Sequence, residues 1–145
     1  MPLIAMQLIA AIHNGVQLEG YWVDSRDGTI WSTKHRNLKH IKGSNHDGYL
    51  RTIFMINGKK CALLLHRIVA CTLIKFPPPT GVSKKDWSVT PESVKRAMSN
   101  LYLINHIDHN RANYHPSNLE WVTHTENAIA SVKHKSARNN FGVEE

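Results

Sequence analysis

The sequence predicts an α+β fold in which N-terminal antiparallel β-hairpins and a helix are followed by a C-terminal strand–loop–strand–helix unit. Two dipeptides typical of tight hairpin turns, Asp27-Gly28 and Asn57-Gly58, each separate two runs rich in β-branched and aromatic residues. Apolar residues at helical spacing then lead to three consecutive prolines, residues 77–79, which end a helix. In the last third, Thr123 and Glu126 have the spacing of a helix N-terminus and follow two short strand-like runs.

The overall composition is that of one globular domain. The chain has 145 residues, of which 41% are hydrophobic and 20% are charged, which excludes global disorder. Cys61 and Cys71 are too few for an all-cysteine zinc site and lie in apolar runs, so we interpret them as core residues of a reducing compartment. Residues 1–12 are apolar, but they lack a basic signal-peptide segment and are shorter than the roughly 20 residues of a membrane span. We therefore expect a first helix docked on the core of a soluble intracellular protein with no membrane partner.

The N-terminal region, residues 1–76, is expected to contain the hairpins and the first long helix. Residues 21–32 form one hairpin and residues 48–65 another, with an exposed strand or loop at residues 34–44 between them. Residues 66–76 follow as a helix because their apolar side chains recur at helical spacing up to the prolines. Three tryptophans inside strand runs are expected to anchor the core: Trp22, Trp31 and Trp121.

The rest of the chain divides into a connection, residues 77–100, and a final unit, residues 101–145. The Pro-rich connection contains Thr90 and Pro91, which suit the N-cap and first residue of a short helix reaching about Asn100. The final unit reads as a strand ending near residue 106, a polar loop, a second strand over residues 118–122 and a helix that begins at residue 123. The strand, loop, strand and helix of this unit, about 35 residues together, are too small to fold on their own apolar content.

The net charge of +7 is concentrated in the middle of the chain. Residues 26–75 carry ten Lys and Arg against Asp27 and Asp47, whereas residues 1–25 are acidic and residues 76–145 are nearly balanced. A basic block interleaved with strands suggests a nucleic-acid surface, although charge alone is equally compatible with a solvated lysine surface. The residues predicted to contact double-stranded DNA, which would make 1–76 the DNA-binding region, are Arg26, Lys34, Arg36, Lys39, Lys42, Arg51, Lys59 and Lys60.

Four residues of the final unit point to chemistry: Asn105, His106, Asn118 and Asn127. If the two strands pair antiparallel and the helix packs across them, His106 can approach Asn127, and Asn105 can point toward the same place. Neutral amide oxygens beside a histidine suit Mg²⁺ or Mn²⁺ and suit zinc poorly. Such an ion can stabilise a leaving 3′ oxygen while a neutral imidazole deprotonates the attacking water, which is the chemistry of phosphodiester hydrolysis.

The run NHIDHNRANYHPSNLEWVTHTEN, residues 105–127, closely resembles the HNH motif of phage- and intron-encoded homing endonucleases. Residues 66–76 (HRIVACTLIKF) and 20–32 (GYWVDSRDGTIWS) resemble the segments that precede this motif in the family. The resemblance implies a C-terminal ββα-metal (HNH) unit and nicking or cleavage of DNA with one divalent metal. It also implies a cytoplasmic location in a bacterial host if the chain is phage- or intron-encoded. No small-molecule cofactor is expected, and the choice between monomer and dimer stays open.

The resemblance assigns a role to each motif residue. His106 would be the general base, Asn105 and Asn127 the metal ligands, and Asn118 the residue that holds the loop between the strands. Asp108 is interpreted as fixing the loop rather than binding the metal. The other histidines of this segment are interpreted as solvated loop or strand-end residues: His109, His115 and His124. His66 and Arg67, at the start of the first helix, are interpreted as structural.

The chain also departs from the family pattern. His109 stands where glycine is common, Tyr114 stands where a second asparagine is common, and residues 77–100 are longer than usual. The chain leaves no room after the motif for the helix-turn-helix of many relatives, so recognition of a long site is not expected. Two other functions were considered: a non-catalytic DNA-binding protein with a decayed motif, which the intact His106, Asn118 and Asn127 disfavour, and an RNA-binding protein of ribosomal type, which leaves the motif spacing unexplained.

Overall fold

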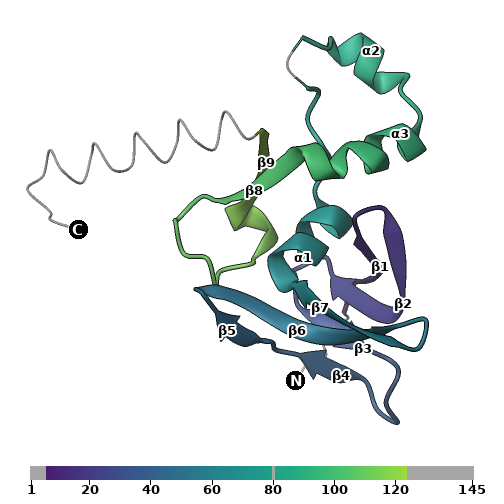
Figure 1. Cartoon of the computed structure of the whole chain (residues 1–145), viewed down its shortest axis with the longest axis vertical. Helices are drawn as coiled ribbons and strands as arrows, with labels where there is room; N and C mark the ends of the chain where they lie inside the picture. The colour runs from purple at the N-terminus through teal and green to yellow at the C-terminus, as the bar shows by residue number, and fades with distance from the viewer. Residues whose placement is uncertain (1–5, 80, 124–145) are drawn as a thin grey trace, which may run out of the picture.

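The computed structural model describes residues 6–79 and 81–123, and these form three antiparallel sheets around one helix (Figure 1). The first sheet contains β1 (Leu8–His13), β2 (Val16–Asp24), β3 (Ile30–Ser32) and β4 (Lys39–Ile41) in that order, and the second contains β5 (Ser44–His46), β6 (Tyr49–Ile56) and β7 (Lys59–Leu64). The third is a ribbon of β8 (Tyr102–His106) and β9 (Leu119–Thr123). The helices are α1 (Leu65–Leu73), α2 (Lys84–Ser88) and α3 (Glu92–Ala97), with 3₁₀ turns η1 (Met98–Leu101) and η2 (Pro116–Asn118). This is the α+β fold that the sequence predicts.

The first element is a strand, so the predicted N-terminal helix is wrong. β1 pairs antiparallel with β2, from Leu8 opposite Asp24 to His13 opposite Val16. The turn between them is Asn14-Gly15, and both residues have positive φ, 48° and 80°. Such a turn matches the twist of two antiparallel strands, and this local signal outweighs the helical appearance of a short apolar run.

The two predicted hairpins are confirmed. In the first, Tyr21 of β2 lies opposite Ser32 of β3, and in the second, Phe54 of β6 lies opposite Cys61 of β7. Asn57 and Gly58 close the second hairpin with φ values of 51° and 76°, as a two-residue turn of this type requires. The exposed segment expected after the first hairpin is also present, as the loop 33–38 and the short strand β4.

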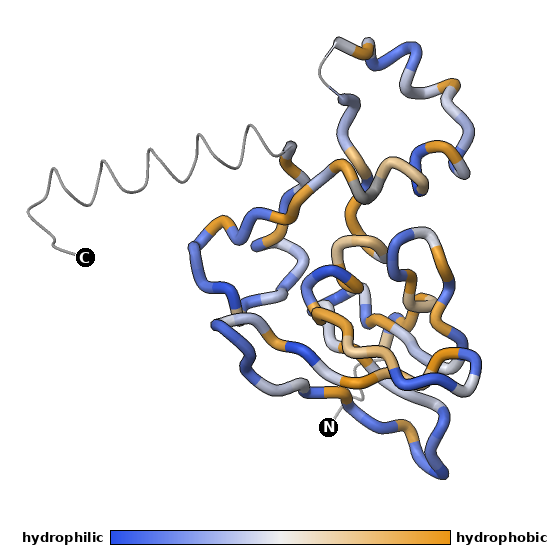
Figure 2. The backbone as a smooth tube through the Cα atoms, in the orientation of Figure 1, coloured by the Kyte–Doolittle hydropathy of each residue, from blue (hydrophilic) through white to orange (hydrophobic). Residues whose placement is uncertain are grey.

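Helix α1 lies at the centre of the core and touches strands of all three sheets. Its buried residues Leu65, Ile68 and Val69 pack in one cluster with Phe54 of β6 and Trp121 of β9. Hydrophobic stretches of the chain gather around this helix, whereas the loops 33–38 and 107–117 are mainly hydrophilic (Figure 2). The small motif ribbon therefore obtains its core from the N-terminal region, as its size requires.

The first long helix ends at Leu73, three residues before the predicted end. Ile74 already has extended backbone angles, φ −110° and ψ 123°, and the chain stays extended into the prolines. This extended segment serves the motif ribbon, because the Ile74 carbonyl accepts a hydrogen bond of 3.0 Å from Trp121 Nε1 and the Phe76 ring lies 4.4 Å from that of Trp121. Trp121 is thus the core anchor that the sequence predicts.

The other two tryptophans do not occupy the core, which corrects that prediction. Trp22 and Trp31 lie opposite each other on β2 and β3 and are only half-buried, while their neighbours Tyr21, Val23 and Ile30 point inward. Because successive side chains of a strand alternate between faces, burying these neighbours places both tryptophans on the outer face. There the Trp31 ring stacks on His40, at a centroid distance of 4.7 Å.

The connection contains one helix that the sequence did not predict. Ser83 caps α2 by accepting a hydrogen bond from the Asp86 backbone N–H at 3.1 Å, and Trp87 is buried with its Nε1 donating to the Phe76 carbonyl. Thr90 is not the cap of the next helix, because its hydroxyl bonds the Asp86 carbonyl at the end of α2 and Pro91 precedes α3 instead. No helix among the described residues is long and apolar enough to cross a membrane.

Candidate active site

The ribbon of β8 and β9 places the motif loop. The strands pair from Tyr102 opposite Thr123 to His106 opposite Leu119, as the sequence predicts. His106 is therefore the last residue of β8, and the loop 107–118 begins directly after it. The helix predicted to start at residue 123 lies outside the described residues, and so do His124 and Asn127.

Asn118 fixes this loop from its buried position, with only 7% of its surface exposed. Its side-chain oxygen accepts a hydrogen bond from the Asp108 N–H at 2.9 Å. Its amide group donates to Asp108 Oδ1 at 2.9 Å and to the Asn113 carbonyl at 3.0 Å. Its own backbone carbonyl accepts from Ile107 at 2.8 Å. All polar atoms of the side chain are therefore used in joining the two ends of the loop.

Asp108 is the acceptor at the other side of this network. Its carboxylate receives bonds from the Asn110 N–H at 2.8 Å and from Asn113 Nδ2 at 2.9 Å, in addition to the bond from Asn118. These bonds, above all the one from Asn113, lower the pKa of Asp108. The carboxylate thus fixes the loop, as the sequence interpretation expected, and remains ionised.

The backbone conformation of His109 explains why glycine is common at this position in the family that the motif resembles. Its φ is +62°, and its N–H donates to the His106 carbonyl at 2.8 Å, which closes a tight turn right after the strand. Glycine adopts this backbone conformation at no steric cost, while other residues adopt it at a modest one. The departure in sequence therefore leaves the turn intact.

His106 itself is 6% exposed and lies in a cluster of rings. Its centroid is 4.8 Å from that of His66 and 5.8 Å from that of Tyr49. Burial lowers the pKa of His106 most strongly; the nearby Asp108 carboxylate raises the pKa, and Arg111 lowers it. The imidazole is therefore neutral at neutral pH, which is the form that can accept a proton.

The sequence did not identify Tyr49, His66 and Arg111 as neighbours of His106. His66 is in the first turn of α1 and Tyr49 begins β6, and their rings lie 5.1 Å apart. The Arg111 guanidinium lies 5.1 Å from the Tyr49 ring centroid and donates to the Asp47 carbonyl at 3.3 Å. Since these residues come from three distant segments, no spacing in the sequence could have indicated the contact.

Asn105 occupies the other side of the strand end. Because neighbouring side chains alternate along a strand, it lies on the face opposite His106, where its Nδ2 donates to Glu120 Oε1 at 2.7 Å. The amide and carboxylate oxygens of these two residues are hard donors that fit Mg²⁺ or Mn²⁺. No cluster of three or more His, Cys, Asp or Glu able to hold a metal is present within residues 6–79 and 81–123.

Comparison with known proteins agrees with this geometry. Residues 100–129 match the family model described as HNH endonuclease. Over these residues the chain is therefore similar to the HNH endonuclease family. The matched segment contains β8, the loop and β9, so the ring cluster and the Asp108–Asn118 network described above belong to the HNH motif and its surroundings.

Two relatives extend the similarity beyond the motif. The chain is 30% identical over 123 residues to the uncharacterized HNH endonuclease L245 of Acanthamoeba polyphaga mimivirus; this covers 83% of the chain and 30% of that protein. The structure of the present chain is similar to that of the HNH homing endonuclease I-HmuI, which was solved to describe DNA binding and cleavage by that enzyme. The TM-score is 0.56 and the sequence identity is 24%. That match covers 81% of this chain and 54% of I-HmuI, and it supports the fold.

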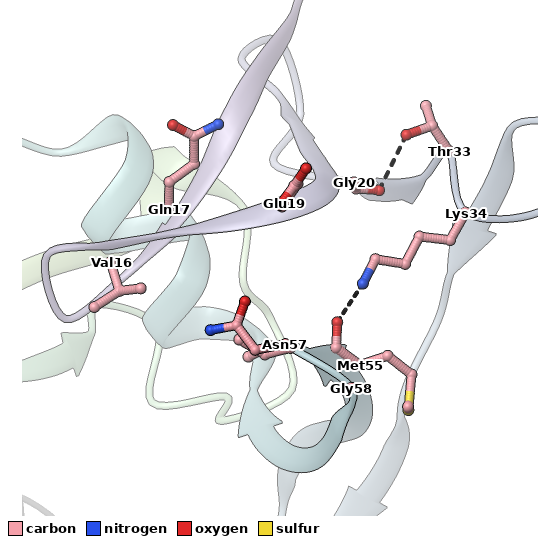
Figure 3. Close-up of a pocket in the computed structure, with 10 residues that line it drawn as sticks. Val16, Gln17, Glu19, Gly20, Thr33, Lys34, Met55, Asn57 and Gly58 are labelled. Atoms are coloured by element: carbon pink, nitrogen blue, oxygen red, sulfur yellow. Dashed lines mark hydrogen bonds between the residues drawn. The ribbon is translucent and has the colours of Figure 1, made fainter.

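Two of the eight predicted DNA contacts are engaged in interactions within the chain itself. Arg26 forms a bidentate ion pair with the buried Asp24, at 2.6 Å between Nη2 and Oδ2, and this holds the pKa of Asp24 down at about 2. Lys34 donates to the Met55 carbonyl and lies 5.0 Å from the Tyr21 ring centroid. Figure 3 shows Lys34 reaching across a pocket from the segment after β3 to the end of β6.

The remaining six cations lie at the surface of the loop 33–38, of β4 and its following residue, and of the second sheet. Five are exposed and Arg51 is half-buried, and none forms a hydrogen bond or ion pair with the described part of the chain: Arg36, Lys39, Lys42, Arg51, Lys59 and Lys60. Positive charge is therefore available both on β6 and β7 of the second sheet and on the segment 36–42 that precedes this sheet in the chain.

The outer face of that sheet also carries large apolar side chains. Ile53 is 61% exposed and Met55 is 37% exposed, and they alternate along β6 with the buried Phe54. Their partners across the hairpin are Ala62 and Lys60, which are exposed as well. The face therefore combines neighbouring apolar side chains with positive charge. Single exposed apolar residues are common on protein surfaces, whereas a group of neighbouring ones suggests a binding surface.

Proposed function

We propose that this protein is a metal-dependent endonuclease of the homing type, which hydrolyses phosphodiester bonds by nicking or cleaving double-stranded DNA. The observation that carries the proposal is His106. It is a buried imidazole, neutral at neutral pH, at the end of a strand inside an HNH motif whose loop is fixed by Asn118 and Asp108. A base held in one place with its lone pair available is what the first step of hydrolysis needs.

In the proposed reaction His106 takes a proton from water, and the hydroxide attacks the phosphorus as the bond to the 3′ oxygen breaks. A divalent ion, Mg²⁺ or Mn²⁺, would supply stabilisation of the charge on that leaving oxygen. Asn105 and Asn127 are the residues we propose to hold it, and Glu120 stands beside Asn105 with a further oxygen donor. The leaving 3′ oxygen takes a proton from solvent, and His106 returns its own proton to solvent.

The N-terminal sheets are proposed to bind the duplex. Three surface cations on the β5–β6–β7 sheet, and three more on the loop 33–38, on β4 and on the residue after β4, have no side-chain partner in the described structure, and phosphates are the groups that such side chains bind. A two-stranded ribbon fits the major groove, where apolar side chains contact thymine methyl groups. The exposed face of Ile53 and Met55 supports this placement, as does the DNA-binding activity named for I-HmuI.

A nicking assay tests the proposal. Supercoiled plasmid carrying the genomic region that encodes the protein is incubated with Mg²⁺ or Mn²⁺, and strand-specific end labels locate each cut. We expect His106→Ala to slow cleavage by about a thousandfold or more while the Kd for DNA stays within about twofold. Loss of binding together with cleavage in this variant would contradict the assigned role of His106.

Binding should depend steeply on salt. If about six phosphates are neutralised, log affinity should fall with log salt concentration at a slope of roughly −5. The alternative function is that of a non-catalytic DNA-binding protein with a decayed motif, which is favoured by the position of Asn105 on the face opposite His106. Salt-dependent binding without nicking in either metal would support that alternative.

A further inference from the structure

His66 is a buried histidine that the proposed reaction does not use. It is the second residue of α1, is 7% exposed, and lies at the place where this helix touches the motif ribbon. An aliphatic or phenyl side chain could fill the same space without carrying a polar ring into the core. The presence of an imidazole there needs a chemical reason.

The rings of His66, His106 and Tyr49 contact one another in pairs. The His66 and His106 rings meet edge to face, with a centroid distance of 4.8 Å and an interplanar angle of 67°. Tyr49 lies against both, at 5.1 Å from His66 and 5.8 Å from His106. Arg111 in turn covers the Tyr49 ring, so the cluster is closed on the side of the motif loop. The His106 ring is thus surrounded mainly by other rings and has little contact with solvent.

Two nitrogens inside this cluster are buried without a hydrogen-bond partner among the described residues: Nδ1 of His66 and Nε2 of His106. Leaving a polar atom unpaired in the core is unfavourable, because the atom loses its hydrogen bonds to water and gains none in return. One bond between the two imidazoles would remove both costs at once, and the ring separation permits it after a rotation of the His106 ring in place. The two nitrogens also have complementary roles, since a neutral imidazole has one donor and one acceptor.

We propose that His66 is a positioning residue that accepts a hydrogen bond at Nδ1 from the Nε2–H of His106 and thereby fixes the tautomer of the general base. The inference rests on the proposed function of His106. Burial, together with the charges of His106 and Arg67, lowers the pKa of His66 to about 3, so this imidazole is a neutral acceptor under all working conditions.

This bond has a direct consequence for the reaction. With the proton of His106 held on Nε2, the lone pair is on Nδ1, and Nδ1 is the nitrogen that takes the proton from water. When His106 becomes an imidazolium, its Nε2–H becomes a stronger donor, so the bond to His66 strengthens as the charge develops. His66 neither gains nor loses a proton, and it acts only through His106.

The decisive variant is His66→Phe, which keeps a ring of similar size and removes the nitrogen. We expect the single-turnover cleavage rate at saturating DNA to fall by about tenfold or more, the scale of losing an orienting partner, while the Kd for DNA stays within about twofold. The matched control is His40→Phe. His40 is half-buried and, like His66, has a buried ring nitrogen without a partner in the described structure and a ring contact with an aromatic side chain, but it lies on the first sheet. At saturating DNA, the His40→Phe variant should cleave at the wild-type rate.

A second measurement needs neither metal nor DNA. Long-range ¹H–¹⁵N correlation spectra of the free protein at pH 8 distinguish the two histidine tautomers, and the His106 signals are assigned by their loss in His106→Ala. We expect the Nε2–H tautomer of His106 in the wild type and a shift toward the other tautomer in His66→Phe. A wild-type His106 protonated on Nδ1, or spectra and rates unchanged in His66→Phe, would overturn the inference. Absence of cleavage by the wild type would instead overturn the proposed function, and the spectra would still decide the role of His66.

Discussion

The motif loop and the basic surface of the second sheet use their polar groups in opposite ways. In the loop, Asp108 and Asn118 are bonded to each other and to Asn113, so the segment after His106 has one conformation. On the sheet, Lys59 and Lys60 extend into solvent with no partner among the described residues. The contrast indicates that the reacting group needs a fixed position, whereas phosphates can be met by long, freely moving charges.

Breaking the loop network should give the largest effect. Asn118→Ala removes three side-chain hydrogen bonds and leaves the Asp108 N–H and the Asn113 carbonyl with one partner fewer, so we expect a loss of about 3 kcal/mol in the free energy of unfolding. Urea denaturation measures it. Cleavage at saturating DNA should also fall, while DNA binding below the denaturation midpoint should change little.

The matched control for that variant is Asn110→Ala. Asn110 is in the same loop, but it is exposed, and among the residues that the structure describes its side chain accepts one hydrogen bond, from the Ala112 N–H at 3.0 Å. We expect less than about 1 kcal/mol of destabilisation. Equal losses in the two variants would show that the loop is not organised around Asn118.

Neutralising the sheet surface should affect binding and leave the chemical step unchanged. For Lys59→Gln combined with Lys60→Gln, we expect the slope of log affinity against log salt to become shallower by about 2, with affinity roughly tenfold weaker at 0.1 M salt. Titration of labelled duplex at several salt concentrations measures both. The control pair is Lys84→Gln with Lys85→Gln on α2, which removes the same charge far from the second sheet (Figure 1). A similar change in the control would assign the effect to net charge alone.

The pairing of Arg26 with Asp24 predicts a dependence of stability on pH. The folded-state pKa of Asp24 is about 2, below its ordinary value of 3.8. The stabilisation is therefore present above pH 4 and is lost as the pH falls from about 4 to about 2. Thermal melts measured from about pH 5 to about pH 2 test this: the melting temperature of Asp24→Asn should lack the part of the decrease that protonation of Asp24 causes in the wild type. In Arg26→Ala it should shrink, whereas Arg36→Ala, which removes an exposed arginine with no ion pair among the described residues, should melt like the wild type.

The apolar part of the sheet face should give the smallest effect. If Ile53 contacts a thymine methyl group, Ile53→Ala should weaken binding of the mapped site by about 1 kcal/mol or less. Replacing thymine with deoxyuridine in the duplex removes only the methyl group, so wild-type protein should lose affinity on that duplex and Ile53→Ala should not. Val89→Ala, at a more exposed position in the connection, serves as the control. An equal penalty for deoxyuridine in both proteins would exclude this contact.

Sequence patterns predicted the parts of the fold that short segments determine. Gly28 in the first hairpin and Asn57-Gly58 in the second have positive φ, which few other residues adopt easily, so the hairpins around them could be predicted. β1 was missed because its apolar run, unlike its Asn14-Gly15 turn, suits a helix equally well. α2 was missed because five residues capped by Ser83 carry too little periodicity.

The candidate site divides in the same way. The position of His106 at a strand end and the role of Asn118 in the loop follow from the motif and its spacing. The contacts with His66 and Tyr49 arise where three distant segments meet, and the pairing of Arg26 with Asp24 depends on which side chains the first sheet buries. The prediction for Asn127 concerns a position outside the described residues.

The motif loop is joined to the N-terminal region, which we propose to bind DNA, at two separate points. Arg111 bonds the β5–β6 turn at the Asp47 carbonyl, and Pro116 packs so closely on the first hairpin that a Cβ on Gly28 would lie 2.8 Å from it. Two attachments prevent the loop from rotating or sliding relative to the sheets. The number of base pairs between the bound sequence and the cut should therefore be constant. A variant with a redesigned sheet face would bind a new target sequence and still cut at the same distance from it.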